Sequence, residues 1–356
     1  MAKIDSLFDV LLAQEGSDLH LLEGERPKIR VHGWLKPIEK EPALTRETLQ
    51  GYLEEICEPD RWARFLETMD LDFAYEKDAR FRFRSNYYFH LKGMGAVFRT
   101  IPTEIQTMET LNLPPVLKTF AQLRSGLVLV TGPTGSGKST TLAGLIDYIN
   151  QTDSRYILTI EEPIEFVHQN RKSHFCQREV GVDTPSFAAA LRDASRQDTD
   201  VILVGEMRDY ETIALAISAA AMGTLVFGTL HTNSASKAID RIIDVFPAEE
   251  QNKARTMLSD SLRGVCAQLL LKRKGGAGRI AANEILLATQ GLSKSIREGN
   301  LSNIRNIIQA GKSNGMQLMD DVIEKYLAER IIDGEEAYFK AQDKKRFIQY
   351  APKGLA

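Results

Sequence analysis

Apolar positions in the first hundred residues follow several different periods. Between residues 4 and 14 they recur every three or four positions, which is the spacing of one face of a helix. The next patterns predict short strands over 19–38 and a helix over 45–56, with Thr45 as its N-cap. A second helix is predicted near 60–68, followed by antiparallel strands over 79–101. We therefore predict a small α+β domain over residues 1–100.

The rest of the chain alternates strand-like and helix-like runs. A segment with three prolines, 101–116, is interpreted as a linker. The predicted strands beyond it are 127–132, 155–163, 201–206 and 224–231, and the predicted helices are 139–151, 186–197 and 210–223. Thr184 and Pro185 are predicted to cap the helix over 186–197, with Pro185 at its first position. This alternation predicts an α/β domain over 117–356, with a parallel sheet covered on both faces, an exposed tip at 272–278 and C-terminal amphipathic helices.

Composition is that of a soluble globular protein, with 43% hydrophobic and 26% charged residues. A net charge of −3 gives no general attraction to nucleic acid or acidic lipid. The three cysteines are far apart in sequence, which argues against a disulfide framework and a zinc knuckle. The N-terminus lacks a signal-peptide pattern, and no apolar run is long enough to span a membrane. We expect a cytoplasmic protein, which could still bind a membrane complex.

The sequence GPTGSGKST follows the first strand of the second domain and matches the phosphate-binding loop G-x-x-x-x-G-K-[ST]. We call residues 132–140 the phosphate loop. Its members are Gly132, Pro133, Thr134, Gly135, Ser136, Gly137, Lys138, Ser139 and Thr140. Backbone amides of such a loop surround a phosphate, and the next helix directs its N-terminus at the same anion. We expect Lys138 to reach the β- and γ-phosphates of ATP, and the Ser139 hydroxyl to bind Mg²⁺.

Polar residues follow three other predicted strands. The strand over 155–163 ends in Glu161 and Glu162, with Glu165 close behind, and the other two end in Glu206 and His231. In open α/β sheets the binding site lies at the carboxyl ends of the strands. Glu206 is therefore predicted to face the γ-phosphate and to polarise water, on the same side of the sheet as the phosphate loop.

The phosphate loop and the three polar strand ends lie in four sequence segments, which occur in the order GPTGSGKST, ILTIEEPIEF, VILVGEMRD and GTLHTNSA. The combination resembles the Walker A, Asp, Walker B and His boxes of secretion ATPases. GSDLHL, FRTIP and GMQLMDD also resemble the PilT/PilU branch of that superfamily, the retraction ATPases of type IV pili. The resemblance covers nearly the whole chain. It implies a PAS-like N-terminal domain, a RecA-like P-loop ATPase domain and a homohexamer, with nucleotide bound between the two domains and near a neighbouring subunit.

The resemblance also assigns roles to individual residues. It implies that Glu206 is the catalytic glutamate, Glu161 the acid of the Asp box and His231 a γ-phosphate sensor. It implies that Arg84 and Arg99 are arginine fingers, and Arg80 and Arg82 are neighbouring candidates for that role. Arg208 is implied in a nucleotide or subunit contact. The implied cofactors are ATP and Mg²⁺. The implied partners are an inner-membrane pilus platform protein and, through it, the pilin fibre, at the cytoplasmic face of the inner membrane; no nucleic acid is expected.

The sequence departs from this family at three places. Glu162 stands where the family has aspartate, and Ala221 and Thr224 lie in a stretch where the family has an acid and a second histidine. Residues 293–301 match the C-terminal family motif only at Ile296, Arg297 and Glu298. That motif bears on retraction in the family.

Several other functions are compatible with the same boxes. Assembly and secretion ATPases usually have a longer N-terminal region and a tetracysteine zinc site, and this sequence has neither feature. A PilU-like accessory protein remains an alternative. A RecA-like nucleic-acid translocase would need a basic stripe with interleaved aromatics, which RFRFRSNYYF resembles superficially. A nucleotide-binding scaffold without turnover would not need both Lys138 and Glu206.

Overall fold

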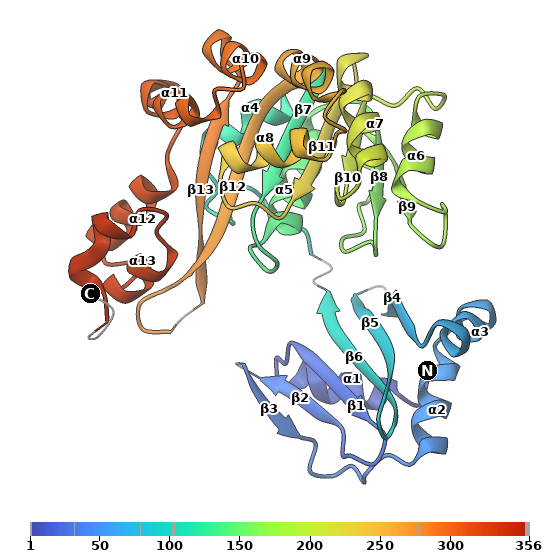
Figure 1. The fold of residues 1–356 in the computed structure, drawn as a ribbon. Helices are drawn as coiled ribbons and strands as arrows, with labels where there is room; N and C mark the ends of the chain where they lie inside the picture. The colour runs from blue at the N-terminus through green and yellow to red at the C-terminus, as the bar shows by residue number, and fades with distance from the viewer. Residues whose placement is uncertain (1, 32, 79, 102–103, 277, 353–356) are drawn as a thin grey trace. The chain divides into compact units, whose positions relative to one another are not determined.

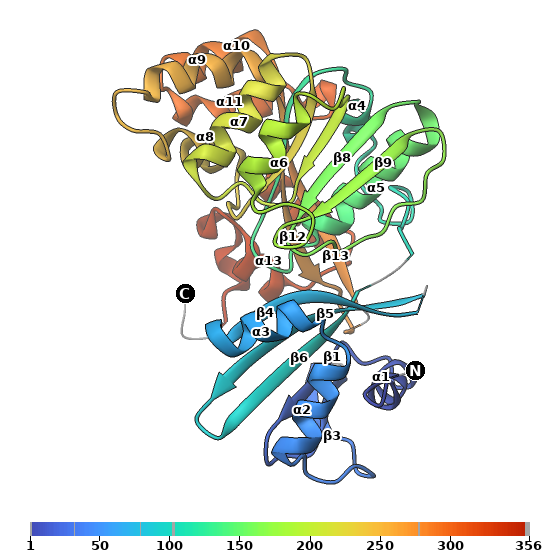
Figure 2. The same ribbon diagram turned by 90° about the vertical axis from the view of Figure 1, so that its right-hand side faces the viewer.

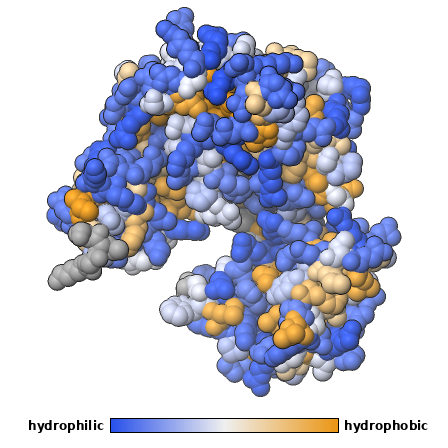
Figure 3. Space-filling model, in the orientation of Figure 1, coloured by the Kyte–Doolittle hydropathy of each residue, from blue (hydrophilic) through white to orange (hydrophobic). Residues whose placement is uncertain are grey.

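The computed structural model describes residues 2–31, 33–78, 80–101, 104–276 and 278–352. They form two compact units, one made of Met1–Glu104 with Glu162–Val167 and the other of Ile105–Glu161 with His168–Ala356 (Figure 1). The visible face in Figure 3 is mostly hydrophilic, with small hydrophobic patches on each unit.

The first unit has one antiparallel sheet with the strand order β3-β2-β1-β6-β5-β4. Its elements are α1 (Asp5–Ala13), β1 (Asp18–Leu22), β2 (Lys28–Val31), β3 (Trp34–Pro37), α2 (Arg46–Glu55), α3 (Pro59–Thr68), β4 (Asp70–Asp78), β5 (Phe81–His90) and β6 (Gly93–Ile101). The predicted apolar face of α1 is buried, and the ring of Phe8 stacks on Phe83 of β5 with centroids 4.1 Å apart. Thr45 caps α2 by accepting from the backbone N–H of Thr48, as predicted. The α+β prediction is confirmed.

The second unit contains a seven-stranded sheet with the order β13-β12-β7-β11-β10-β8-β9. Its elements are η1 (Pro115–Leu117), α4 (Lys118–Ala121), β7 (Gly126–Thr131), α5 (Lys138–Thr152), β8 (Tyr156–Glu161), β9 (His174–Glu179), α6 (Phe187–Ala194), β10 (Val201–Val204), α7 (Tyr210–Ala221), β11 (Leu225–Leu230), α8 (Ala235–Asp244), α9 (Gln251–Ser261), β12 (Leu262–Lys272), β13 (Arg279–Leu287), α10 (Gln290–Arg297), η2 (Leu301–Asn303), α11 (Ile304–Ala310), η3 (Lys312–Asn314), α12 (Met319–Ala328), α13 (Gly334–Lys340) and η4 (Lys344–Tyr350).

All neighbouring strands of this sheet pair in parallel except β12 and β13, which form an antiparallel hairpin. Helices α4 and α5 cover one face, and the group from α6 to α11 covers the other (Figure 2). Strand residues are buried on both faces, which explains their continuous apolar runs. The parallel α/β prediction is confirmed. Of the predicted tip at 272–278, residue 277 lies outside the described residues, and residues 273–276 lie between β12 and β13.

Two local findings differ from the sequence analysis. The predicted cap of α6 is wrong, because the Ser186 hydroxyl accepts from the backbone N–H of Ala189 at 3.1 Å and Pro185 precedes this cap. Of the segment 101–116, interpreted as a linker, residues 102 and 103 lie outside the described residues, and residues 105–116 belong to the second unit. Met108 and Leu113 are buried there in the same core as α5.

Candidate active site

The phosphate loop connects β7 to α5, and at two of its glycines both the backbone conformation and close packing exclude a side chain. Gly132 has φ +150° and Gly137 has φ +84°, both in the region that favours glycine. A Cβ at Gly132 would lie 2.3 Å from the Gln268 carbonyl oxygen, and a Cβ at Gly137 would lie 2.9 Å from the Gln268 side-chain nitrogen. The loop is therefore packed closely against β12.

Three buried side chains hold this loop in place, and we call them the Gln268 network. Gln268 donates to the Ser136 carbonyl oxygen at 2.6 Å, and its own side-chain oxygen accepts from Thr141 at 2.8 Å and Asn283 at 2.9 Å. All three side chains are buried. The sequence analysis missed Gln268 and Asn283 because no motif includes them. The only signal was their polarity within apolar strand runs.

Lys138 begins α5, and its ammonium donates to the carbonyl oxygens of Gly132 at 2.8 Å and Pro133 at 3.2 Å. Ser139 and Thr140 follow in the first turn, and their side chains are partly exposed. The N-terminal amides of such a helix favour an anion. The loop, the lysine and the helix start therefore form an arrangement suited to binding phosphate.

Glu206 follows the end of β10 and lies beside His231, which follows the end of the neighbouring strand β11. The Glu206 carboxylate is 2.9 Å from His231 Nε2 and also accepts from Arg208 Nε. Its side chain is 19% exposed, so it is open to solvent from one side. Burial opposes ionisation, but the hydrogen bond and charge of Arg208, with the contribution of His231, lower the pKa of Glu206 below its ordinary value.

Gly205 brings Glu161 close to Glu206, because its amide donates to the Ile160 carbonyl oxygen at 2.8 Å and a Cβ there would lie 3.2 Å from Glu161 Cα. Glu161 accepts a hydrogen bond from Thr159 at 2.9 Å. Glu162, the next residue, belongs to the segment Glu162–Val167 that groups with the first unit. Glu161 and Glu162 thus belong to different units, and of the two only Glu161 lies at the strand ends of the second unit.

The loop and the strand ends lie at one edge of the sheet. Gly132 N donates to the Leu230 carbonyl oxygen at 3.1 Å, so the start of the phosphate loop is bonded to the residue before His231. Ala221 and Thr224, where the sequence departs from the family, precede β11 and lie at its opposite end from His231. These two departures are therefore remote from the phosphate loop.

Arg84 and Arg99 are direct cross-strand partners in the first unit, and we call them the arginine pair. Arg84 Nε is 3.1 Å from Asp72, and Arg99 Nε is 2.9 Å from Asp18. The hydrogen bond that Arg84 donates to Asp72, although opposed by burial, raises the pKa of Arg84, and nearby acidic charges add to this effect. Both side chains are partly exposed, at 41% and 65%. The register thus presents two guanidinium groups together.

The two alternative arginines have different surroundings. Arg80 precedes β5, is 80% exposed and lies 3.9 Å from Asp78. Arg82 pairs with Ile101, and its Nε is buried. Two of the three arginines of RFRFRSNYYF, Arg80 and Arg84, thus contact acidic residues, and the three do not form a continuous basic stripe.

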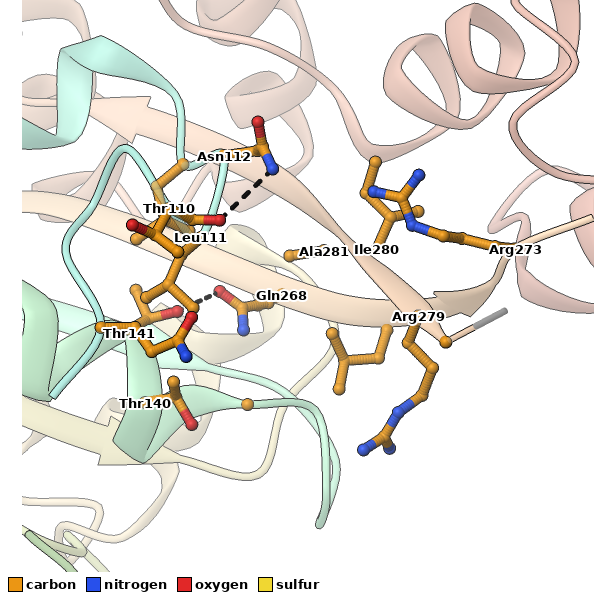
Figure 4. Close-up of a pocket in the computed structure, with 15 residues that line it drawn as sticks. Thr110, Leu111, Asn112, Thr140, Thr141, Gln268, Arg273, Arg279, Ile280 and Ala281 are labelled. Carbon is orange, nitrogen blue, oxygen red and sulfur yellow. Dashed lines mark hydrogen bonds between the residues drawn. The ribbon is translucent and has the colours of Figure 1, made fainter. Parts of the chain in front are cut away.

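A pocket of about 480 Å³ adjoins the start of α5 (Figure 4). Thr140, Thr141 and Gln268 line one end, and Arg273 and Arg279 lie toward the other, as Figure 4 shows. Residues 110–113 line it as well. The pocket continues from the phosphate loop and combines amide, hydroxyl and guanidinium groups with apolar side chains.

The residues near the phosphate loop suit a hard cation shared with phosphates. Across the described ranges, no group of three or more His, Cys, Asp or Glu side chains is arranged to hold a metal by itself. Ser139 offers a hydroxyl oxygen, and Glu206 and Glu161 offer carboxylates. Mg²⁺ is usually bound by one or two protein oxygens together with substrate phosphates, and this donor set fits that pattern.

Comparison with known proteins agrees with this geometry. The family model of the Type II/IV secretion system protein matches residues 3–300. The chain is 48% identical over 334 residues to the type IV pilus retraction ATPase PilT of Pseudomonas aeruginosa, covering 94% of this chain and 96% of that protein. It is 47% identical over 317 residues to a twitching motility protein of Neisseria gonorrhoeae, covering 89% and 84%.

A solved structure extends the likeness to the whole fold. The crystal structure of the pilus retraction motor PilT with bound ADP matches with a TM-score of 0.90 and 40% identity, covering 98% of this chain and 99% of that one. Within the part of the chain that the structure describes, no helix is both long and apolar enough to cross a bilayer. The chain belongs to the type II/IV secretion system protein family, in its branch of type IV pilus retraction ATPases.

Proposed function

We propose that this chain is a hexameric motor that hydrolyses ATP to power retraction of type IV pili, at the cytoplasmic face of the inner membrane. The observation that carries the proposal is the position of Glu206, which lies 2.9 Å from His231 and on the same sheet edge as the phosphate loop. The likeness to retraction ATPases over nearly the full chain supports the mechanical role.

The phosphate loop and α5 bind the triphosphate in this proposal. The amides of residues 132–140 surround the β- and γ-phosphates, and Lys138 exchanges its two carbonyl partners for phosphate oxygens. Ser139 would hold Mg²⁺, which when bound neutralises phosphate charge. The nucleoside then occupies the pocket beyond Thr140, where hydroxyl, amide and guanidinium groups are available.

Glu206 is the acceptor of the proton from the attacking water. Its pKa is held below the ordinary value, so it is ionised at neutral pH and can accept a hydrogen bond from water. His231 lies beside it and would donate to a γ-phosphate oxygen, while Glu161 adds a second oxygen acceptor at the strand ends. Arg84 and Arg99 would neutralise charge that builds up on the transferred phosphoryl group.

The first experiment replaces the cell's own copy with Glu206→Ala and measures pilus retraction together with ATP hydrolysis by the purified protein. We expect loss of hydrolysis and cells that carry many pili but do not retract them. Glu249→Ala, which changes an exposed acid outside the site, is the matched control. Loss of hydrolysis with normal retraction would contradict the motor role and would favour an accessory protein or another machine.

The C-terminal motif over 293–301 matches the family pattern at three positions only, so a separate variant tests it in the same assay. In α10, Ile296 is buried and Arg297 lies 3.2 Å from Asp260 of α9. Arg297→Ala should leave ATP hydrolysis intact and slow retraction. Unchanged retraction would remove this motif from the mechanism without affecting the assignment of Glu206.

A further inference from the structure

Glu284 is a buried acid in β13 that the proposed chemistry does not use. It is 4% exposed. Strand pairing places Leu230 opposite Thr131, Thr131 opposite Ala267, and Ala267 opposite Glu284. This row crosses the sheet at the level where β7 enters the phosphate loop and β11 reaches His231. A buried carboxylate is costly unless it is well hydrogen-bonded, so its contacts matter.

The Glu284 carboxylate holds the first residues of two helices. Oε1 accepts from the backbone N–H of Ala235, which begins α8, at 2.8 Å. Oε2 accepts from the backbone N–H of Met319, which begins α12, at 3.4 Å. Helix N-termini stabilise a negative charge. Burial nevertheless raises the pKa of Glu284 above its ordinary value, against these hydrogen bonds.

Gln342 connects the same carboxylate to the loop that carries His231. Its side-chain nitrogen lies 3.4 Å from Glu284 Oε2 and donates to the Asn233 carbonyl oxygen at 3.0 Å. The backbone N–H of Gln342 donates to the buried Asp320 of α12 at 2.8 Å. Residues 231–234 are therefore bordered on one side by Glu206 and on the other by Gln342, in the segment that follows α13. Helices α12 and α13 lie beside β13 in Figure 1.

We propose that Glu284 and Gln342 are positioning residues that couple the C-terminal helices α12 and α13 to the loop bearing His231. Glu284 fixes the start of α8, and Gln342 fixes the carbonyl of Asn233, two residues after His231. A shift of the C-terminal helices then moves His231 relative to Glu206. The inference rests on the proposed role of His231 in hydrolysis.

Gln342→Ala tests the coupling, since Gln342 is exposed and its loss creates no cavity in the core. We expect kcat for ATP to fall about threefold to tenfold, the effect of one or two hydrogen bonds, with the Kd for ADP and the Tm unchanged. Tyr326→Phe is the matched control, because its hydroxyl joins α12 to the Ala281 carbonyl of β13 without contacting residues 231–234. It should leave kcat unchanged.

A double-mutant cycle with His231→Ala separates coupling from general structural damage. If Gln342 acts through His231, then Gln342→Ala has no further effect on kcat in the His231→Ala background. An equal loss in both backgrounds, or a loss equal to that of Tyr326→Phe, overturns the inference.

The cycle also separates this inference from the proposed function. A normal kcat for His231→Ala would remove the proposed role of His231 and this inference with it. A low kcat for His231→Ala with a normal kcat for Gln342→Ala would remove the inference alone. Glu284→Gln is the second variant. The new amide N–H groups would face a group that is itself a donor, either the backbone N–H of Ala235 or the backbone N–H of Met319 and the side-chain amide of Gln342. The substitution should lower kcat more than Gln342→Ala does, and an unchanged kcat in this folded variant would also overturn the coupling.

Discussion

The phosphate loop and the arginine pair are anchored by residues of very different exposure. Gln268, which bonds to the phosphate loop, is 1% exposed, whereas the Asp72 side chain, which bonds to Arg84, is 34% exposed. The first anchor consists of neutral amide and hydroxyl groups buried between β12, β13 and α5. The second is an ion pair open to solvent, and so is weakened by salt and contributes little to stability. The phosphate site is therefore built before nucleotide arrives, while the arginine pair keeps contacts that it can exchange for phosphate.

The largest effect is expected on the phosphate-loop side of this comparison, at Glu206. Glu206→Gln keeps the shape of the side chain but removes the proton acceptor, so kcat should fall by about a thousandfold. ADP affinity should stay close to that of the unchanged protein, because the phosphate loop and the Gln268 network are intact. Hydrolysis and ADP titration on the same preparation check this. Loss of ADP binding instead would place Glu206 in the binding site rather than the chemical step.

On the exposed side, Arg84→Ala should lower kcat by about a hundredfold, less than a lone arginine finger provides, because Arg99 lies directly opposite. Steady-state hydrolysis measures kcat and KM, and KM should change little. Arg80→Ala is the matched control and should have a minor effect. If Arg80→Ala is as damaging as Arg84→Ala, the arginine pair is assigned to the wrong residues.

Removing the buried anchor should affect binding more than chemistry. Gln268→Leu leaves Thr141, Asn283 and the Ser136 carbonyl without their shared partner. We expect about 2 kcal/mol loss of unfolding free energy and about tenfold weaker ADP binding. Chemical denaturation and calorimetric titration measure the two quantities. Gln290→Leu, the same change at an exposed site, should alter neither, and an equal loss there would show that the effect is not specific to the network.

The smallest expected effect is a shift in the pH dependence of kcat. The pKa of Glu206 is below its ordinary value, so its ionised form persists as pH falls and is lost only when pH passes through that lowered value. Arg208→Ala removes the main group that lowers this pKa. The acidic limb of the kcat profile should then move to higher pH, with the neutral and alkaline limbs unchanged. An unmoved acidic limb would mean that another group controls it.

Much of the fold could be predicted because its signals are local. The apolar runs of β7, β8, β10 and β11, and the glycines of the phosphate loop, are contiguous in sequence. The Gln268 network joins residues separated by 127 and 132 positions, and a single sequence contains no local pattern for such a contact. The cap of α6 was missed because Ser186 and Thr184 both suit that role, and only backbone geometry selects Ser186.

The alternation of side chains along β13 also determines where this chain tolerates added sequence. Asn283 and its neighbour Glu284 point to opposite faces of the sheet, one toward α5 and the other toward α8. One residue inserted between Ile280 and Asn283 would exchange those faces and send the amide and the carboxylate to the wrong helices. An insertion at the turn between Gly275 and Gly276 leaves every rung of the hairpin in register. A reporter peptide placed there should therefore label the motor without disturbing either strand.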